Sequence, residues 1–344
     1  MNLSKLVLSA VFAGAILLVG CSNDKEKGLQ PEVEASKKPA SFDKSALTTS
    51  PFTGVQEQQS DMRPILATIN NHPLARPQSG LSSADFVYEF YAEGNITRLL
   101  ALYQSELPEE IGPIRSARDY FVELAKGLDA FYIAHGYSPD AKALLTTDFV
   151  DNINGMQYDG TYFVRSHERK APHNSYISKE HVEAAMEDLS IDEKMHEAPP
   201  LSFHPDAESA KLGEVASTII VGYEDPKFTS TYSFDKNTRI YERTVDGILT
   251  TDKAGDKKVT PANILVMEAP YETIDAEGRQ TLDLTQGGPA ILFQNGVALK
   301  LEWKQIDGVL TPVQDGIPAK LVPGQTWVHI VREQSIGNTT TYTP

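Results

Sequence analysis

From about residue 216 to the C-terminus, the chain is a succession of short β-rich runs separated by two-residue turn signals. The runs lie at 219–221, 230–234, 239–244, 264–268, 290–293, 297–303 and 327–331. The turn pairs that punctuate them are Asp246-Gly247, Asn295-Gly296, Asp307-Gly308, Asp315-Gly316 and Pro323-Gly324. An Asn-Gly pair between two alternating runs is the strongest short-range signal for a β-hairpin. This half of the chain is therefore expected to form mostly antiparallel β-structure.

A further hairpin is predicted in the first half of the chain. Two β-rich runs flank the pair Gly94-Asn95, which can form the connecting turn. These runs lie at 86–91 and 96–104. With this turn, Tyr91 is expected to lie opposite Arg98, and Glu89 is expected on the same face within reach of the guanidinium.

Helical spacing is found only before the β-rich half. Apolar residues recur at three- and four-residue intervals over 114–128, which predicts an amphipathic helix that begins just after Gly112-Pro113. Shorter helices are predicted at 140–145 and 178–189, and a buried strand is predicted at 131–134.

The change of periodicity divides the folded part of the chain into two predicted domains. A length of 344 residues fits two domains of roughly 100–200 residues each. The expected fold class is α+β, with a mixed α/β domain at 51–205 that is followed by a smaller, mostly antiparallel β domain at 206–344.

The first twenty residues have the pattern of a lipoprotein signal peptide. Lys5 precedes an apolar run of about fourteen residues, which is shorter than the roughly 20 residues that a spanning helix needs. The run ends at Gly20-Cys21, where a small residue before cysteine predicts cleavage and diacylglyceryl modification of the thiol. The alternative is a plain membrane anchor that happens to contain a cysteine.

Cys21 is the only cysteine in the chain, so an intramolecular disulfide and a cysteine-rich zinc site are both excluded. Acyl chains on Cys21 are the expected link to the membrane. Residues 21–50 combine this lipidated cysteine with a tether rich in Lys, Glu, Ser and Pro, which is too polar to fold. The expected location is the extracytoplasmic face of the cell membrane.

The charge balance excludes several classes of partner. With 31 basic and 47 acidic residues, the chain has a net charge of −16. This charge argues against nucleic acid as a binding partner, because the phosphates of nucleic acid attract positively charged protein surfaces. An anionic ligand would need a local basic pocket. The sequence contains no HExxH, GxSxG, GxxxxGK[ST] or GxGxxG pattern, so neither a metal nor a cofactor is expected.

The segment from Gly112 to Arg118 is the first candidate site. If Pro113 occupies the first helical turn, Arg115 and Arg118 project from one face beside free backbone N–H groups, an arrangement that suits phosphate or carboxylate. Arg98, from the predicted hairpin, is a further candidate for this pocket. The alternative is a pair of surface arginines that form ion pairs with Glu109, Glu110 or Asp119.

A second group of basic residues lies at 163–174. Arg165 and Arg169 could bind an anion through their guanidinium forks, and His173 could bind or move a proton near neutral pH. A solvated loop, or a structural network with Asp148 or Asp159, is the alternative.

His135 and Glu89 are the candidates for proton transfer. His135 follows a predicted strand, a position where sites of α/β proteins often lie, and it could equally be a hydrogen-bonded core histidine. Glu89 could act as an acid or base, although structural pairing with Arg98 competes with that interpretation.

Several segments together resemble the YerB-like lipoproteins of low-GC Gram-positive bacteria. In the first half they are Arg63-Pro-Ile, Asn70-Asn-His-Pro, Arg76-Pro-Gln-Ser-Gly-Leu81, Gly112-Pro-Ile-Arg-Ser-Ala-Arg118 and Ala171-Pro-His-Asn174. In the second half they are Tyr241-Glu-Arg243, Asn263-Ile-Leu-Val266 and Pro323-Gly-Gln-Thr-Trp327. The resemblance implies a secreted, lipid-anchored protein with two folded parts, and it carries no activity over to any residue.

Two functions fit these observations. The first is a membrane-tethered binding protein that uses the β domain to contact a protein partner and the arginine pocket to hold an anionic envelope ligand. The alternative is a cell-envelope enzyme that acts on a phosphorylated lipid-linked or glycan substrate, with arginines as the anion clamp and His135 or His173 as the proton carrier.

Overall fold

The computed structural model describes residues 49–56 and 61–344. The predicted signal peptide, Cys21 and nearly all of the predicted tether lie outside the described residues. Within the described ranges, every helix is too short or too polar to cross a membrane.

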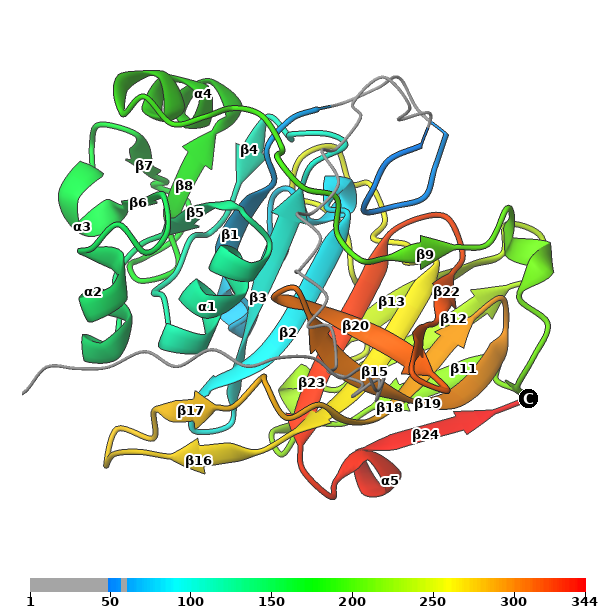
Figure 1. Ribbon diagram of the computed structural model, residues 1–344. Coiled ribbons are helices and arrows are strands. Elements are labelled where there is room, and N and C mark those ends of the chain that lie inside the picture. The colour runs from blue at the N-terminus through cyan, green and yellow to red at the C-terminus, as the bar shows by residue number, and fades with distance from the viewer. Residues whose placement is uncertain (1–48, 57–60) are drawn as a thin grey trace, which may run out of the picture. The chain divides into compact units, whose positions relative to one another are not determined.

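One large sheet runs through the described part of the chain (Figure 1). Its twelve strands among the described residues are β1 (Ile65–Asn70), β2 (Phe86–Glu93), β3 (Ile96–Tyr103), β5 (Phe131–Ala134), β6 (Asn152–Asn154), β10 (Glu214–Val215), β15 (Asn263–Ala269), β18 (Gly288–Gln294), β19 (Val297–Ile306), β20 (Val309–Gln314), β21 (Ile317–Pro318) and β23 (Thr326–Arg332). The order across the sheet is β21-β20-β19-β18-β15-β23-β2-β3-β1-β5-β6, and β10 pairs with β19.

Both halves of the sequence contribute to this sheet. Strand β23, near the C-terminus, lies between β15 and β2 and is parallel to both. The predicted domain boundary at residue 205 therefore falls between strands that belong to one hydrogen-bonded sheet. The protein is a strand-rich α+β protein, as its sequence predicts at the level of fold class.

Side chains alternate between the two faces of the large sheet, as the period of a strand requires. On β2, Phe86, Tyr88 and Phe90 enter one apolar core, whereas Val87 and Tyr91 enter the core on the opposite face. The central strands are thus buried on both faces, which explains why they are almost continuously apolar.

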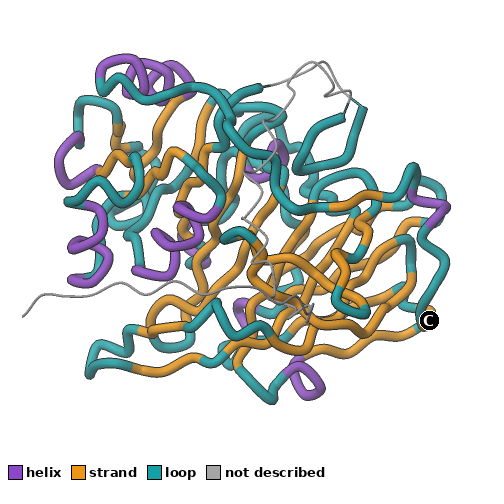
Figure 2. Tube along the Cα trace, in the orientation of Figure 1, coloured by secondary structure: helices purple, strands orange, loops and turns teal. Residues whose placement is uncertain are grey.

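The remaining elements cover these two faces. The helices of the described residues are α1 (Asp119–Gly127), α2 (Pro139–Leu145), α3 (Gly155–Tyr158), α4 (Lys179–Asp188) and α5 (Ile336–Thr339), together with the 3-10 helices η2 (Pro73–Ala75), η3 (Leu81–Ser83), η4 (Ala207–Ser209) and η5 (Pro226–Phe228). A five-stranded sheet consists of β11 (Thr218–Val221), β12 (Ser230–Asp235), β13 (Ile240–Val245), β14 (Ile248–Leu249) and β24 (Thr340–Thr343). A three-stranded sheet consists of β4 (Glu110–Ile111), β7 (Phe163–Arg165) and β8 (Ser175–Ser178). Two further sheets have two strands each, β16 (Tyr271–Thr273) with β17 (Gln280–Leu282), and β9 (Ser202–Phe203) with β22 (Lys320–Leu321). Helix α1 packs on the face that carries Phe90, and β11, β12 and β13 pack on the opposite face. Figure 2 shows that most of the helical segments lie beside the strands of the first half.

The hairpins form where the turn residues predict them. Asn295 and Gly296 connect β18 to β19 and both have positive φ, 48° and 74°, as a type I′ turn requires. Helix α4 begins after Ser178, whose side chain accepts a hydrogen bond from the backbone N–H of His181. Such a cap satisfies one of the free donors of the first turn.

The register predicted for the first hairpin is wrong. Arg98 pairs with Phe90 instead of Tyr91, because a β-bulge between Tyr91 and Glu93 shifts the strand by one residue. A shift of one residue moves each side chain to the other face of the sheet. Arg98 and Glu89 therefore lie on opposite faces, and the predicted contact between them does not form.

The helix predicted at 114–128 begins only at Asp119. The preceding segment is extended and is held by backbone hydrogen bonds from Arg115 N to Thr68 O and from Ala117 N to Gly136 O. Arg118 is the N-terminal capping residue, with φ −126° and ψ 158°. The expectation that Arg115 and Arg118 share a helical face is therefore incorrect, because strand neighbours supply the hydrogen bonds that a helical turn would have made.

Candidate anion-binding site

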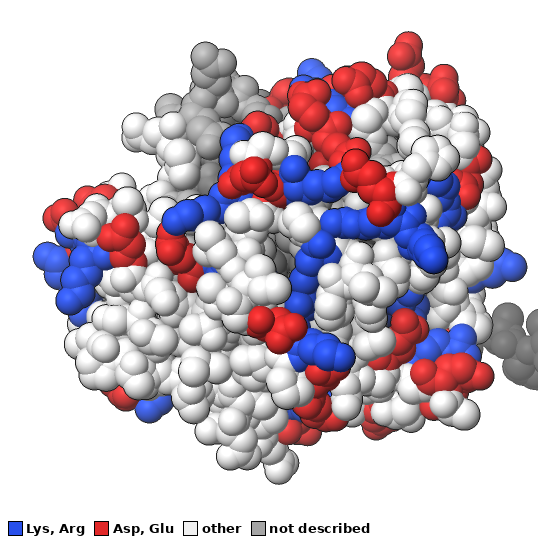
Figure 3. Space-filling model, turned by 180° about the vertical axis from the view of Figure 1, so that it is seen from behind, with Lys and Arg blue, Asp and Glu red and all other residues white. Residues whose placement is uncertain are grey.

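Positive side chains gather locally although the chain as a whole is acidic. Figure 3 shows Lys and Arg side chains in a band across one face, beside a wide area with few charged side chains. The predicted arginines lie in three groups, around Glu93, around His135, and against the backbone near Ala75.

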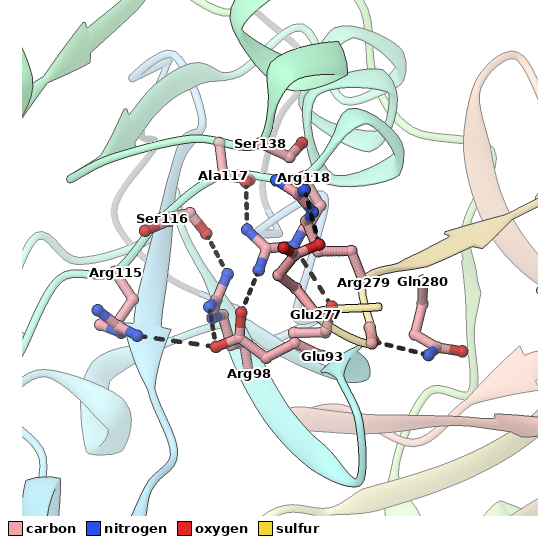
Figure 4. A network of polar contacts seen from close by, with 12 residues as sticks. Glu93, Arg98, Arg115, Ser116, Ala117, Arg118, Ser138, Glu277, Arg279 and Gln280 are labelled. Atoms are coloured by element: carbon pink, nitrogen blue, oxygen red, sulfur yellow. Dashed lines mark hydrogen bonds and ion pairs between the residues drawn. The ribbon is translucent and has the colours of Figure 1, made fainter. Parts of the chain in front are cut away.

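Glu93 forms the centre of the first group (Figure 4). Its Oε1 lies 2.8 Å from Arg98 Nη2, and its Oε2 lies 2.7 Å from Arg118 Nη2. Arg98 Nη1 also donates to the carbonyl of Ser116, and Arg118 Nη1 donates to the carbonyl of Ala117. Burial disfavours the charged carboxylate, but the arginines outweigh this effect and hold the pKa of Glu93 below its usual value.

The structure brings Arg98, Arg115 and Arg118 together around Glu93, but the three arginines have different surroundings. The side chains of Arg98 and Arg118 are almost fully buried and are neutralised by Glu93, so they stabilise the fold. Arg115 is 22% exposed, and its Nη2 lies 3.9 Å from Glu93, which is too far for a hydrogen bond. Among the described residues, Glu93 is the one carboxylate that forms an ion pair with Arg115.

Two histidines, His72 and His173, lie near the segment of Arg115, because Asn70, which contacts both of them, donates its backbone N–H to the carbonyl of Pro113. The rings of His72 and His173 are stacked with their centroids 4.6 Å apart. Burial is the main cause that lowers the pKa of both imidazoles, and the positive charge of Arg115 acts in the same direction on each. Both rings are therefore neutral near pH 7.

The hydrogen bonds of the two rings fix which nitrogen carries the proton. The backbone N–H of Leu74 donates to His72 Nδ1, so the proton of the neutral ring is on Nε2. Asn70 Oδ1 accepts from the backbone N–H of His72, which turns the Asn70 amide nitrogen toward His173 Nδ1 at 2.8 Å. His173 therefore also has its proton on Nε2, and both histidines keep an N–H donor for a ligand.

His135 and Arg165 form the second group. Arg165 Nη2 donates to His135 Nε2 at 2.7 Å, and His135 Nδ1 in turn donates to the hydroxyl of Ser175 at 2.8 Å. Arg165 also forms an ion pair with Asp159 at 2.9 Å. Both ring nitrogens of His135 are engaged, and a Cβ on Gly155 would lie 2.0 Å from Nδ1, so the ring is packed tightly. This arrangement leaves His135 no free nitrogen for proton transfer.

Arg169 is bound to the backbone at the end of η2 and just after it. Its Nη1 donates to the carbonyl of Ala75 and to the hydroxyl of Tyr176, and its Nη2 donates to the carbonyl of Pro77. These contacts connect the loop at 165–174 to the segment that carries His72.

Glu89 lies outside these groups, on the opposite face of the large sheet, and is completely buried. Its Oε1 accepts hydrogen bonds from Asn71 Nδ2 at 3.0 Å and from Thr97 Oγ1 at 2.9 Å. Its Oε2 lies 3.2 Å from both Arg243 Nη2 and Trp327 Nε1. A carboxylate enclosed in this way stabilises the fold and has no access to a ligand.

Sequence reasoning missed two residues of the candidate site, namely Asn70 and His72. Their signal is a run of polar residues and prolines directly after an apolar strand, from Asn70 to Pro77. Among the described residues there is no group of three or more His, Cys, Asp or Glu side chains that could hold a metal ion.

Comparison with known proteins identifies the family. Residues 52–192 match the family described as "Protein of unknown function (DUF3048) N-terminal domain", and residues 219–328 match its C-terminal domain. Together the two matches cover well over half of the chain. The chain belongs to the DUF3048 family.

This DUF3048 protein is similar to a protein of known sequence and to a solved crystal structure. The chain is 42% identical over 303 residues to the Bacillus subtilis (strain 168) protein named "Putative lipoprotein YerB", covering 87% of this chain and 91% of the relative. It is also similar to the crystal structure of YerB protein from Bacillus subtilis, with a TM-score of 0.79 and 40% identity, covering 86% of this chain and 99% of that one. The predicted resemblance to YerB-like proteins is thereby confirmed.

Proposed function

We propose that this protein is a lipid-anchored, extracytoplasmic binding protein that holds an anionic group, such as a phosphate, between Arg115, His72 and His173. The name of the B. subtilis relative and the Gly20-Cys21 pair support the lipid anchor. Acyl chains on Cys21 would keep the folded part at the membrane surface.

The observation that carries the proposal is the incomplete neutralisation of Arg115. Glu93 has two carboxylate oxygens, and both are hydrogen-bonded to the buried guanidinium groups of Arg98 and Arg118. Arg115 therefore retains a positive charge at a partly exposed position, and this charge acts on two neutral imidazoles that can each donate an N–H. One guanidinium and two N–H donors suit the several oxygens of a phosphate.

Binding fits this geometry better than catalysis does. A proton carrier needs a free nitrogen near the reacting group, and both nitrogens of His135 are already hydrogen-bonded. Glu89, a second proton-transfer candidate, is fully buried on the other face of the sheet. His173, the third, can donate a hydrogen bond through Nε2, but its Nδ1 accepts one from Asn70, so it has no free nitrogen that could accept a proton. The release of a dephosphorylated product from a phosphorylated envelope precursor would favour the enzymatic alternative instead.

Replacing Arg115 with Gln is expected to weaken phosphate binding by about tenfold or more, because hydrogen bonds to charged groups contribute roughly 1.5–3 kcal/mol. Titration of the full chain with inorganic phosphate, followed by phosphorus NMR, measures this change. Arg239→Gln is the matched control, since Arg239 is an exposed arginine paired with Glu208. Equal phosphate affinity of wild type and Arg115→Gln would contradict the proposed site.

The anchor has its own test. Growth of cells with a clickable palmitate analogue is expected to label the wild-type protein, and Cys21→Ala is expected to abolish the label because no other cysteine is present. Label that persists in Cys21→Ala would refute lipid attachment at this residue.

A further inference from the structure

An apolar pocket of about 260 Å³ adjoins the segment that carries His72. It lies between residues 73–78 and the β13–β14 hairpin, and its apolar lining includes Pro73, Pro77, Val245, Ile248 and Leu249. Small-molecule sites usually have volumes of roughly 300–1,000 Å³, so this pocket has room for one short apolar group of a ligand and not for a whole large ligand.

Exposed apolar side chains accompany the pocket. Ile248 in its lining is 69% exposed, and Leu74 in the adjoining helix η2 is 67% exposed. Single exposed apolar side chains are common, but two large ones beside an apolar pocket indicate a surface that a ligand covers.

Arg76 connects this pocket to the candidate anion site. It lines the pocket, and its positive charge also contributes to the lowered pKa of His72. Its Nε and Nη1 donate to the backbone carbonyls of Asn71 and Lys227, and its guanidinium forms no ion pair with a carboxylate among the described residues. Burial is the main cause that lowers the pKa of Arg76 to about 10, so the group stays charged at neutral pH.

Positive charge therefore extends from the anion site to the mouth of the pocket. Arg76, Lys227 and Arg115 each lower the pKa of His72, and each outweighs Asp225, which acts in the opposite direction. Arg76 lines the pocket together with Asp246, so the pocket itself carries one charge of each sign. A negatively charged ligand is attracted along this row, whereas the lining of the pocket favours an apolar group.

We propose that the ligand is an amphipathic phosphate monoester, whose phosphate lies at Arg115, His72 and His173 and whose short branched apolar group fills the pocket beside Ile248. This inference rests on the proposed function and specifies its ligand. Charge alone would accept any phosphate, and the pocket adds selectivity for the apolar ester.

The test compares two soluble monoesters that carry the same charge. Isoamyl phosphate is expected to bind the full chain at least about tenfold more tightly than methyl phosphate, because it buries several more methylene-sized groups. Ile248→Asp is expected to remove this difference while leaving the affinity for methyl phosphate within about twofold, since the phosphate contacts are untouched. Isoamyl alcohol, which has no charge, is expected not to bind measurably.

A matched control is available on another hairpin. Ile317 has the same 69% exposure as Ile248 and lies in β21, so Ile317→Asp adds the same charge away from the pocket and is expected to keep the preference for isoamyl phosphate. Equal affinity of wild type for the two monoesters would overturn the proposal of an amphipathic ligand, but it would not contradict the proposed anion site. A preference that survives in Ile248→Asp, or that disappears equally in Ile317→Asp, overturns the assignment to this pocket. If neither monoester binds, the proposed function itself is overturned.

Discussion

Replacing Arg243 with Met is expected to lower the free energy of unfolding by about 3–5 kcal/mol, because it leaves the carboxylate of Glu89 buried without its charge partner. Both side chains are excluded from solvent, at 1% and 0% exposure, and Arg243 Nη2 lies 3.2 Å from Glu89 Oε2. Arg243 also stacks on the ring of Trp327, with Cζ 4.0 Å from the centroid. Chemical denaturation at pH 7 measures the loss.

The pair connects parts of the chain that are far apart in sequence. Arg243 comes from β13 and Glu89 from β2, while His329 on β23 lies 3.6 Å from the same carboxylate. The ring of His329 is held by the hydroxyls of Tyr223 and Tyr232 at 2.8 and 2.7 Å. Burial lowers the pKa of His329 well below its usual value, so this ring is neutral and Arg243 is the cation that balances Glu89.

The effect of Arg243→Met is expected to depend on pH. Burial raises the pKa of Glu89 above its usual value of 4.5, and Arg243 is the largest influence in the opposite direction. The folded wild type therefore already keeps the proton on Glu89 to a higher pH than the unfolded state does, and removal of Arg243 raises this pKa further. Stability of the variant therefore falls as the pH rises above about 4.5, and the loss is smaller at pH 5 than at pH 8.

Arg239→Met is the control for this prediction. It removes the same group from an exposed ion pair with Glu208 and is expected to cost about 1 kcal/mol or less. A similar small loss in Arg243→Met, with no dependence on pH, would show that the buried pair does not contribute as argued.

Replacing Glu93 with Gln is expected to have the second largest effect, about 2–3 kcal/mol, because two buried guanidinium groups then lose their shared counter-charge. The value lies below that for a fully buried pair, since the side chain of Glu93 is 32% exposed. The same denaturation measurement applies. Glu277→Gln, at a 70% exposed residue paired with Arg279, is the matched control and is expected to change stability by less than about 1 kcal/mol.

The pH dependence of Glu93→Gln has the opposite sign. Despite burial, Arg98 and Arg118 hold the pKa of Glu93 below its usual value of 4.5, so the unfolded state takes up the proton first as the pH falls. The stabilisation is complete above about pH 4.5 and is lost as the pH falls through the lower, folded-state pKa. The stability difference between wild type and Glu93→Gln should therefore shrink in acid, and a difference that grows in acid would contradict this account.

Local signals predicted those elements whose cause lies within a few residues. Asn295 and Gly296 tolerate the positive φ of a tight turn, and Ser178 caps a helix start through its own side chain. The sequence also placed Arg98, Arg115 and Arg118 in one candidate pocket, but it relied on a helical face of Arg115 and Arg118 that does not form. It could not show which of the three remains available to a ligand, because that depends on where Glu93 lies.

The sequence by itself determined the strand-rich α+β character, the hairpins and the family, since periodicity, turn residues and short motifs are properties of neighbouring residues. Only the tertiary structure decided the rest. A bulge of one residue moved Arg98 to the face opposite Glu89, and a strand from the C-terminus was inserted in parallel beside β2. Contacts of this kind join residues that are distant in the chain. Whether an arginine forms a buried ion pair or remains available to a ligand therefore depends on tertiary packing, which cannot be inferred from neighbouring residues.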